Sequence, residues 1–167
     1  MKEITIKEWG VNPFAAIGKE WMLITAAKDG KVNTMTASWG GMGVIWGADV
    51  VYVFIRQSRF TKEFIDAADT FSLTFFPRNA QKALAYLGSH SGRNEDKIGK
   101  VGFHVAFNNG TPYFEEAQTT VICTKWSKHS IKLEDMPADV REKWYADNDY
   151  HDMYIGRIEK VLVKETI

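Results

Sequence analysis

The chain has 167 residues and a mass of 19.0 kDa, which fits one domain over residues 1–167 better than two. Hydrophobic residues make up 45% and charged residues 25%, close to globular averages, so disordered, collagen-like and coiled-coil chains are excluded. Lysine plus arginine (21) equals aspartate plus glutamate (21), so no net charge attracts nucleic acid or an anionic membrane, and we expect neither as a partner.

Strand patterns dominate the first half of the chain. Glu20–Ala27 and Val32–Ser38 flank an Asp-Gly pair at residues 29 and 30, a strong hairpin signal, so these segments should pair antiparallel. Val50–Ile55 is continuously apolar, as expected of a central strand covered on both faces. Phe71–Phe76 alternates apolar with hydroxyl residues, which is typical of a half-buried strand.

Similar patterns continue toward the C-terminus. Further strands are expected at Gly102–Phe107, Thr119–Trp126 and Met153–Val163. The stretch Asn108-Asn109-Gly110 predicts a hairpin turn, because Asn and Gly tolerate positive φ.

Helical patterns are fewer and shorter. Thr61 is expected to cap one helix, Asn79 a second that ends at Gly88, and a third should begin at Pro137. These helices do not alternate one for one with the strands, which argues against a doubly wound parallel sheet. A β-barrel with helical insertions is the better architecture.

Familiar catalytic and metal motifs are absent from the sequence. It has no G-x-x-x-x-G-K-[ST] loop and no complete G-x-G-x-x-G turn. Its four histidines are widely spaced and its single cysteine rules out a four-thiolate zinc site, so no metal is expected. Folding could pair Cys123 with His129 as a nucleophile, but a buried, inert thiol explains Cys123 better. One cysteine allows no intrachain disulfide, which favours a reducing, cytoplasmic location.

The segment Arg56–Lys62 concentrates groups that suit a phosphate. It follows the most apolar strand and leads into a helix, so Arg56, Ser58, Arg59 and Thr61 gather at one turn. Guanidinium groups bind phosphate oxygens bidentately, hydroxyls donate, and a helix N-terminus adds backbone donors. The alternative is a solvated basic turn in which Thr61 only caps the helix.

A second unusual segment, Asn33–Gly43, is rich in small residues and glycine. A flat ligand could approach its backbone, while Thr36, Ser38 and main-chain N–H groups donate to the ligand's oxygens and Trp39 supplies an apolar wall. The alternative is a barrel corner in which the glycines relieve crowding and Trp39 fills the core.

A third segment, the loop Gly88–Lys97, is polar. It could complete an anion site through Ser89, Ser91, Arg93 and Lys97. The alternative is a plain connecting loop.

In this order the segments resemble the flavin reductase-like, FMN-binding split-barrel family, in particular its flavoredoxin-like members. The resemblance covers nearly the whole chain. It is carried by Asn33-x-Met35-Thr36-Ala37-Ser38-Trp39, Arg56-x-Ser58-Arg59-Phe60-Thr61, Ser91-Gly92-Arg93-x-x-Asp96-Lys97, and His151 five residues before Gly156.

The resemblance implies a mainly β fold, a split β-barrel with short helical insertions. It also implies a homodimer with one non-covalent FMN per subunit near the dimer interface. The Thr36–Trp39 stretch would lie along the isoalloxazine ring and the Arg56–Thr61 stretch would hold the phosphate. Asn33, Ser89, Ser91, Arg93 and Lys97 complete the candidate cofactor site.

The resemblance further implies redox chemistry that the flavin performs. We expect an oxidoreductase that transfers hydride from NADH or NADPH to flavin. The alternatives are a flavoredoxin-like electron carrier reduced by a redox protein partner, and a flavin binder without redox turnover. Backbone donors from Thr36 to Trp39 would stabilise negative charge on the reduced ring. His151 is the best candidate for a polar group near the flavin or the nicotinamide, although a histidine at the start of a strand is more often structural.

Overall fold

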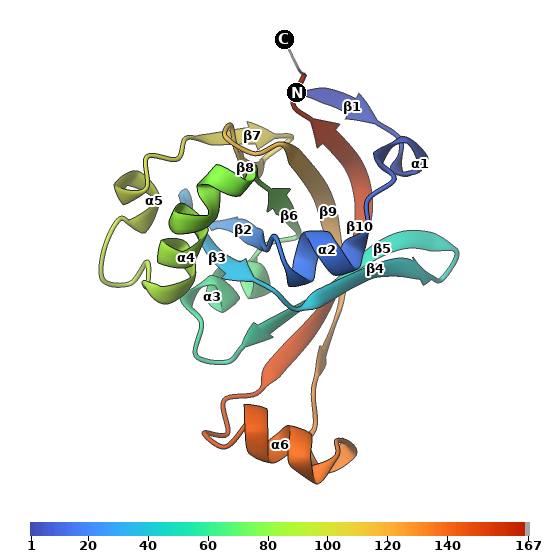
Figure 1. The fold of residues 1–167 in the computed structure, drawn as a ribbon, viewed down its shortest axis with the longest axis vertical. Coiled ribbons are helices and arrows are strands. Elements are labelled where there is room, and N and C mark those ends of the chain that lie inside the picture. Colours follow the sequence, from blue (N-terminus) through green and yellow to red (C-terminus); the bar gives the residue numbers. More distant parts are fainter. Residues whose placement is uncertain (166–167) are drawn as a thin grey trace.

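The computed structural model describes residues 1–165, which form a curled antiparallel sheet with short helices around it (Figure 1). The strands are β1 (Lys2–Ile4), β2 (Met22–Lys28), β3 (Lys31–Ala37), β4 (Gly40–Ile45), β5 (Ala48–Arg56), β6 (Thr70–Phe75), β7 (Val105–Asn108), β8 (Thr111–Phe114), β9 (Thr119–Ser130) and β10 (His151–Val163). The α-helices are α1 (Ile6–Trp9), α2 (Pro13–Gly18), α3 (Phe60–Ala67), α4 (Gln81–Ser89), α5 (Lys97–Lys100) and α6 (Ala138–Trp144).

The main sheet has eight strands in the order β3-β2-β6-β9-β10-β5-β4, with β1 paired to β10. Its two edge strands, β3 and β4, are consecutive in the chain and are joined only by Ser38 and Trp39. The step from Ala37 to Gly40 spans at most about 11 Å, so the sheet must curl until its edges nearly meet. Among the described strands β3 and β4 share no ladder, so the barrel is split at Ser38-Trp39.

Two apolar clusters hold the sheet to its helices. The larger lies on the face covered by α2 and α3 and includes Ile24 and Leu73, both fully buried. The smaller joins β2 to α4 and β8 through Leu23, Leu87 and Phe114. Because successive residues of a strand point to opposite faces, β2 contributes Leu23 to one cluster and Ile24 to the other.

The predicted strands are all present, with ends shifted by a few residues, and both predicted hairpins form. Asp29 and Gly30 have φ of 50° and 73°, and Asn109 and Gly110 have φ of 47° and 84°, as two-residue turns of this kind require. The sequence analysis named no strand at β1 or β4, and at β8 it predicted only the turn that precedes the strand. A glycine-rich corner was its alternative for the segment at β4, but pairing with β5 gives those glycines a strand conformation.

The expectation that β5 is covered on both faces is wrong. Val51 and Val53 are fully buried, but Tyr52 and Phe54 on the opposite face are only half-buried. The outer face of β5 remains partly open beside the split in the barrel.

Two predicted helix caps are also wrong. Arg59 is the N-cap of α3, and Thr61 lies in the first turn, where its hydroxyl accepts a hydrogen bond from Asn33 Nδ2 at 2.8 Å. The chain enters α4 through a 3-10 turn over Arg78–Ala80, so Asn79 is not a cap, and α4 runs one residue past Gly88. The hydrogen bond with Asn33 accounts for the place of Thr61, and the 3-10 turn before α4 accounts for that of Asn79. The predicted third helix is α6, with Pro137 as its N-cap.

β9 continues past the end of β6 to Ser130, and residues 131–150 between β9 and β10 form an arm, which includes α6 (Figure 1). Over residues 1–165, no helix is both long and apolar enough to cross a membrane. In the same range, no group of three or more His, Cys, Asp or Glu side chains is placed to hold a metal ion.

Candidate functional site

Two adjoining cavities open where β3 and β5 end beside the start of α3. The first, about 500 Å³ in volume and here called the polar cavity, lies between α3 and the loop 89–97. The second, about 310 Å³ and here called the aromatic cavity, lies over the split and reaches the arm. They share Met35, Arg56 and Arg59 as walls, so they form one continuous site of a size typical for small-molecule ligands.

Every residue that the sequence analysis placed in the candidate flavin site lines one of these cavities. The polar cavity has Asn33, Arg56, Ser58, Arg59, Phe60, Thr61, Ser89, Ser91, Arg93 and Lys97. The aromatic cavity has Thr36, Ala37, Ser38, Trp39 and His151, together with the shared arginines. The fold thus brings together three segments and one strand end that are far apart in the chain.

Two cations face the polar cavity, the half-buried Arg59 and the buried Lys97. Arg59 Nη1 donates to Gly88 O at 2.6 Å, and Lys97 Nζ donates to Leu87 O at 2.7 Å and to His90 O at 2.9 Å. Among the described residues, neither cation has a carboxylate within 4.0 Å. Burial, and then the charge of Arg59, lower the pKa of Lys97 to about 8. Burial and Arg56 likewise lower the pKa of Arg59. An anion in this cavity would relieve the repulsion.

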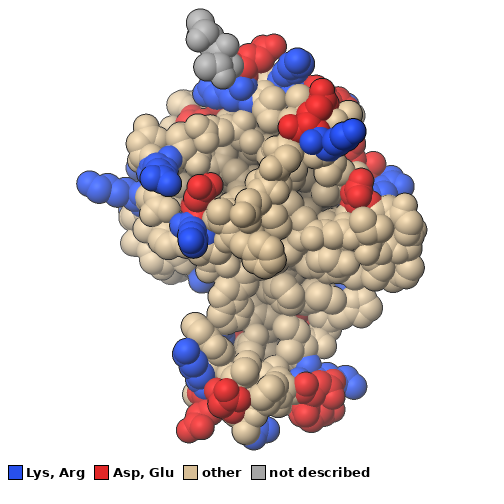
Figure 2. Space-filling model, turned by 45° about the vertical axis from the view of Figure 1, so that its right-hand side comes forward, with Lys and Arg blue, Asp and Glu red and all other residues tan. Residues whose placement is uncertain are grey.

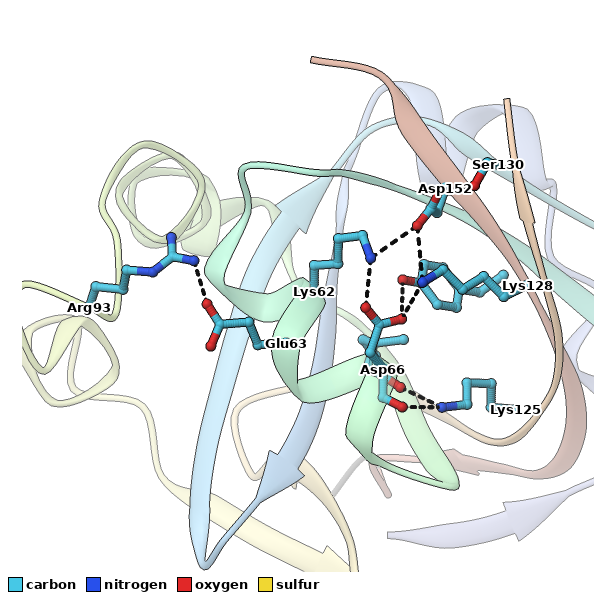
Figure 3. A network of polar contacts seen from close by, with 10 residues as sticks. Lys62, Glu63, Asp66, Arg93, Lys125, Lys128, Ser130 and Asp152 are labelled. Carbon is cyan, nitrogen blue, oxygen red and sulfur yellow. Dashed lines mark hydrogen bonds and ion pairs between the residues drawn. The ribbon is translucent and has the colours of Figure 1, made fainter. Parts of the chain in front are cut away.

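α3 begins at the same cavity, and no side chain caps its first turn. Its position is set by an ion-pair network on the other side (Figure 3). Lys62 Nζ lies 2.6 Å from Asp66 Oδ2 and 3.0 Å from Asp152 Oδ2, and Lys128 Nζ lies 2.9 Å and 3.2 Å from the same two carboxylates. Because Asp152 follows His151 in β10, the network fixes α3 relative to the strand that carries this histidine.

The loop 89–97 closes the polar cavity opposite α3. Arg93 Nη2 donates to Glu63 Oε1 at 2.5 Å (Figure 3). Arg93 Nη1 donates to Ser58 O at 3.2 Å. Arg93 is therefore exposed and already paired, unlike Arg59. A Cβ on Gly92 would lie 2.3 Å from Asn33 Oδ1, so only glycine allows the loop to approach β3 this closely.

Some hydroxyls that the sequence suggested as ligand donors are used within the protein. Thr36 Oγ1 donates to Leu84 O at 2.5 Å, and Ser89 Oγ donates to Ala85 O at 2.9 Å, inside its own helix. Ser38 is exposed at the split. In the Thr36–Trp39 stretch, the backbone and Ser38 are therefore better placed to serve a ligand than Thr36 Oγ1.

Aromatic rings form the walls of the second cavity. Trp39 is 37% exposed, so it does not fill the core. Its ring centroid lies 5.0 Å from that of His151 and 5.0 Å from that of Trp144, the latter at an interplanar angle of 85°. Phe54 from the open face of β5 lines the same cavity. Flat apolar walls of this kind suit a planar ring system.

His151 starts β10 and lines the aromatic cavity. Its Nδ1 shares a hydrogen bond of 2.8 Å with the hydroxyl of Tyr145. Burial, and then the positive charge of Arg56, lower the pKa of His151 to about 4. The imidazole is therefore neutral at physiological pH, and one ring nitrogen is already bonded to Tyr145.

The arm supplies site residues that the sequence analysis missed. Arg56 Nη1 donates to Asp149 O at 2.6 Å, and Arg56 Nη2 donates to Trp144 O at 2.9 Å. The first pair is 93 residues apart in the chain and the second 88, and backbone acceptors carry no residue signature. Nothing in the local sequence could therefore indicate that the arm contacts the Arg56 turn.

The alternative Cys123–His129 nucleophile does not form. Cys123 is fully buried, burial raises the pKa of its thiol, and its Sγ contacts only a backbone carbonyl. His129 lies six residues further along β9, on its exposed end, and bonds to Ser127. Cys123 is the inert thiol that the sequence favoured.

Comparison with known proteins identifies a matching family and several solved structures with a similar fold. The family model described as flavin reductase like domain matches residues 14–167. The crystal structure of FMN-binding protein from Thermus thermophilus with bound 1-cyclohex-2-enone has a TM-score of 0.67 at 24% identity, over 86% of this chain and 69% of that chain. Flavoredoxin of Desulfovibrio vulgaris (Miyazaki F) has a TM-score of 0.69 at 22% identity, over 99% of this chain and 78% of that chain.

A third solved structure, the NADH:FAD oxidoreductase of Streptomyces globisporus C-1027, has a TM-score of 0.64 at 14% identity, over 87% of this chain and 75% of that chain. A search of curated proteins gives no match. At these identities the structures show the fold, and they confirm the predicted mainly β split barrel of the FMN-binding type.

Proposed function

The chain belongs to the flavin reductase-like family, and from that premise we propose that it binds FMN non-covalently in the joined cavities and transfers hydride to it from NADH or NADPH. One observation carries the proposal. Lys97 is buried and Arg59 is half-buried, neither has a carboxylate partner among residues 1–165, and both line the polar cavity, which adjoins a cavity with flat aromatic walls.

The residues present fit the chemistry of FMN. Its dianionic phosphate would suit the two cations and the uncapped start of α3, which offers backbone N–H donors. A planar ring would suit the walls made by Trp39 and Phe54. The glycine at position 92, which keeps the loop tight against Asn33, leaves the space beside α3 open.

In the reaction the protein would bind the flavin, orient it and stabilise charge on its ring. FMN, when bound, supplies the two-electron redox chemistry, so no side chain has to act as a base. Backbone donors along Ser38 and Trp39 would stabilise negative charge that develops on a ring beside them. His151 is neutral and held by Tyr145, so it would contribute a fixed hydrogen-bonding group rather than a charge.

We further propose that two copies of the chain associate as a homodimer. Phe14 (87% exposed), Val44 (69%) and Trp46 (64%) lie on α2 and on the β4–β5 hairpin. Figure 2 shows a broad face without charged side chains between the charged end of the molecule and the arm. Exposed apolar patches of this kind mark association surfaces. A light-scattering mass of a single subunit at micromolar concentration would contradict the dimer.

The test is to purify the chain without added flavin, record its visible spectrum, and then titrate FMN. We expect a flavin spectrum or saturable FMN binding, followed by steady oxidation of NADH or NADPH when FMN is present. Bound FMN without nicotinamide oxidation would favour the electron carrier reduced by a redox protein partner. Failure to bind flavin at all would overturn the proposal. A cytoplasmic location stays a prediction.

A further inference from the structure

The carboxylate of Asp149, on the arm, occupies donors at the rim of the polar cavity. Its Oδ1 accepts from the backbone N–H of Ser58 at 3.0 Å, and its Oδ2 accepts from the Ser58 hydroxyl at 2.6 Å. Asp149 Oδ2 also lies 4.0 Å from Arg56 Nη1, and Asp149 lines the cavity beside Arg59. Its side chain is 21% exposed, so solvent screens its charge only in part.

This arrangement matches the way a phosphate would use the same turn. Two oxygens of one anion accept from a backbone N–H and a hydroxyl next to a guanidinium group. Ser58 is one of the residues expected to hold the phosphate, yet both of its donors are bonded to Asp149. A ligand phosphate that uses Ser58 must displace the carboxylate, and one that does not must still lie near its negative charge.

We propose that Asp149 is a specificity-determining residue that competes with the flavin phosphate and lowers the preference for FMN over unphosphorylated riboflavin. The proposal rests on FMN binding at this site. Riboflavin has the same ring and no phosphate, so it neither competes for Ser58 nor feels the charge of Asp149 to the same degree. A weakened hold on FMN makes the flavin exchangeable, as a flavin substrate must be.

A purely structural role for Asp149 makes the opposite prediction. If its carboxylate only holds the arm against the Ser58 turn, weakening that contact should loosen the site and reduce the affinity for both flavins. Asp147 serves as a control carboxylate near the same arginine; it is 68% exposed, and its Oδ1 accepts from the backbone N–H of Asp149 at 3.1 Å. Its Oδ1 lies 3.6 Å from the same Arg56 Nη1, but it makes no hydrogen bond to Ser58 and does not line the cavity.

The experiment titrates wild type, Asp149→Asn and Asp147→Asn with FMN and with riboflavin, followed by quenching of flavin fluorescence. Asparagine keeps the shape and one acceptor oxygen, so the turn should hold. In Asp149→Asn we expect FMN to bind about tenfold more tightly and riboflavin to change by less than about twofold. In Asp147→Asn we expect both affinities to stay within about twofold of wild type.

A second variant tests whether Asp149 and the phosphate compete for the Ser58 hydroxyl. In the Ser58→Ala background the hydroxyl is absent, so the gain in FMN affinity from Asp149→Asn should be smaller than in the Ser58 background. Thermal denaturation of each variant checks that it folds. Unchanged or weaker FMN binding in Asp149→Asn, an equal gain for both flavins, or an equal gain in Asp147→Asn would overturn the proposal.

The binding measurements separate the proposed function from the role of Asp149. If wild type binds FMN and Asp149→Asn shows no selective gain, the specificity role is wrong and the proposed function stands. If wild type binds neither flavin, the proposed function is overturned, and the role of Asp149 is overturned with it.

Discussion

Lys97 is buried and has no carboxylate partner within residues 1–165, so FMN binding should weaken at alkaline pH. Its pKa is lowered to about 8 by burial and by Arg59, so it loses its charge as the pH rises through that value. A bound phosphate favours the protonated amine and is itself a dianion above about pH 6. The affinity for FMN should therefore be flat between about pH 6.5 and 7.5 and fall above about pH 8.

The size of the effect follows from the protonated fraction of Lys97. With a pKa of about 8, the amine is about nine-tenths protonated at pH 7 and about one-tenth at pH 9. If only the protonated form holds the phosphate, the affinity for FMN falls about tenfold over these two pH units, which is about 1.4 kcal/mol. Riboflavin carries no phosphate, so the ratio of the two affinities isolates this effect from any titration of the shared ring.

The assay is a fluorescence titration with FMN and riboflavin at half-unit steps of pH in wild type, Lys97→Arg and Lys97→Met. The guanidinium of Lys97→Arg stays charged throughout this range, so its affinity ratio should stay high and flat. Lys97→Met should show a low, flat ratio. A constant ratio in wild type from about pH 6.5 to 9.5, or the same slope in Lys97→Met, would refute the assignment of Lys97 to the phosphate.

Three further predictions test other parts of the site. Arg59→Ala should weaken FMN binding by about ten- to a hundredfold, because it removes a half-buried charged donor from the polar cavity. Arg93→Ala should have a much smaller effect, since Arg93 is exposed and paired with Glu63, and equal small losses in a flavin titration would contradict this. Ser38→Ala should leave the fold and the affinity for FMN nearly unchanged, while Ser38→Pro should abolish flavin binding, because proline removes the backbone N–H at the split. A Ser38→Pro protein that folds and binds FMN normally would show that the backbone at this position does not contact the ligand. Because burial and Arg56 lower the pKa of His151 to about 4, the unfolded chain takes up a proton below about pH 6.5 that the folded chain does not, so the free energy of unfolding should fall as the pH drops from about 6.5 to 4. Urea unfolding at several pH values should show a smaller fall in His151→Gln, and an identical fall would place the acid sensitivity elsewhere.

Local sequence was sufficient for the hairpins and for the position of the binding segments. Asp29-Gly30 and Asn109-Gly110 form turns because only residues that tolerate positive φ can occupy them, and that preference belongs to the residues themselves. The Arg56–Thr61 segment was identifiable for a similar reason. Its donors are adjacent in the chain, at the junction of an apolar strand and a helix, so its composition alone indicates an anion.

Contacts between segments far apart in the chain determine the features that local sequence did not predict. β4 has three glycines among its first four residues, which lowers its strand propensity, and it is a strand because β5 provides its hydrogen-bond partners. Thr61 is expected to cap α3 but instead accepts a hydrogen bond from Asn33 on β3.

The arm is the clearest example of contacts that local sequence does not predict. Tyr145, Asp149 and the carbonyl of Trp144 reach the site only because β9 and β10 extend together and return the chain beside Arg56. Sequence patterns describe which groups are present and how the backbone prefers to turn. Which cations have no carboxylate partner within residues 1–165, as Arg59 and Lys97 have none, and which donors are already bonded to one, as Ser58 is to Asp149, depends on neighbours up to 93 residues away.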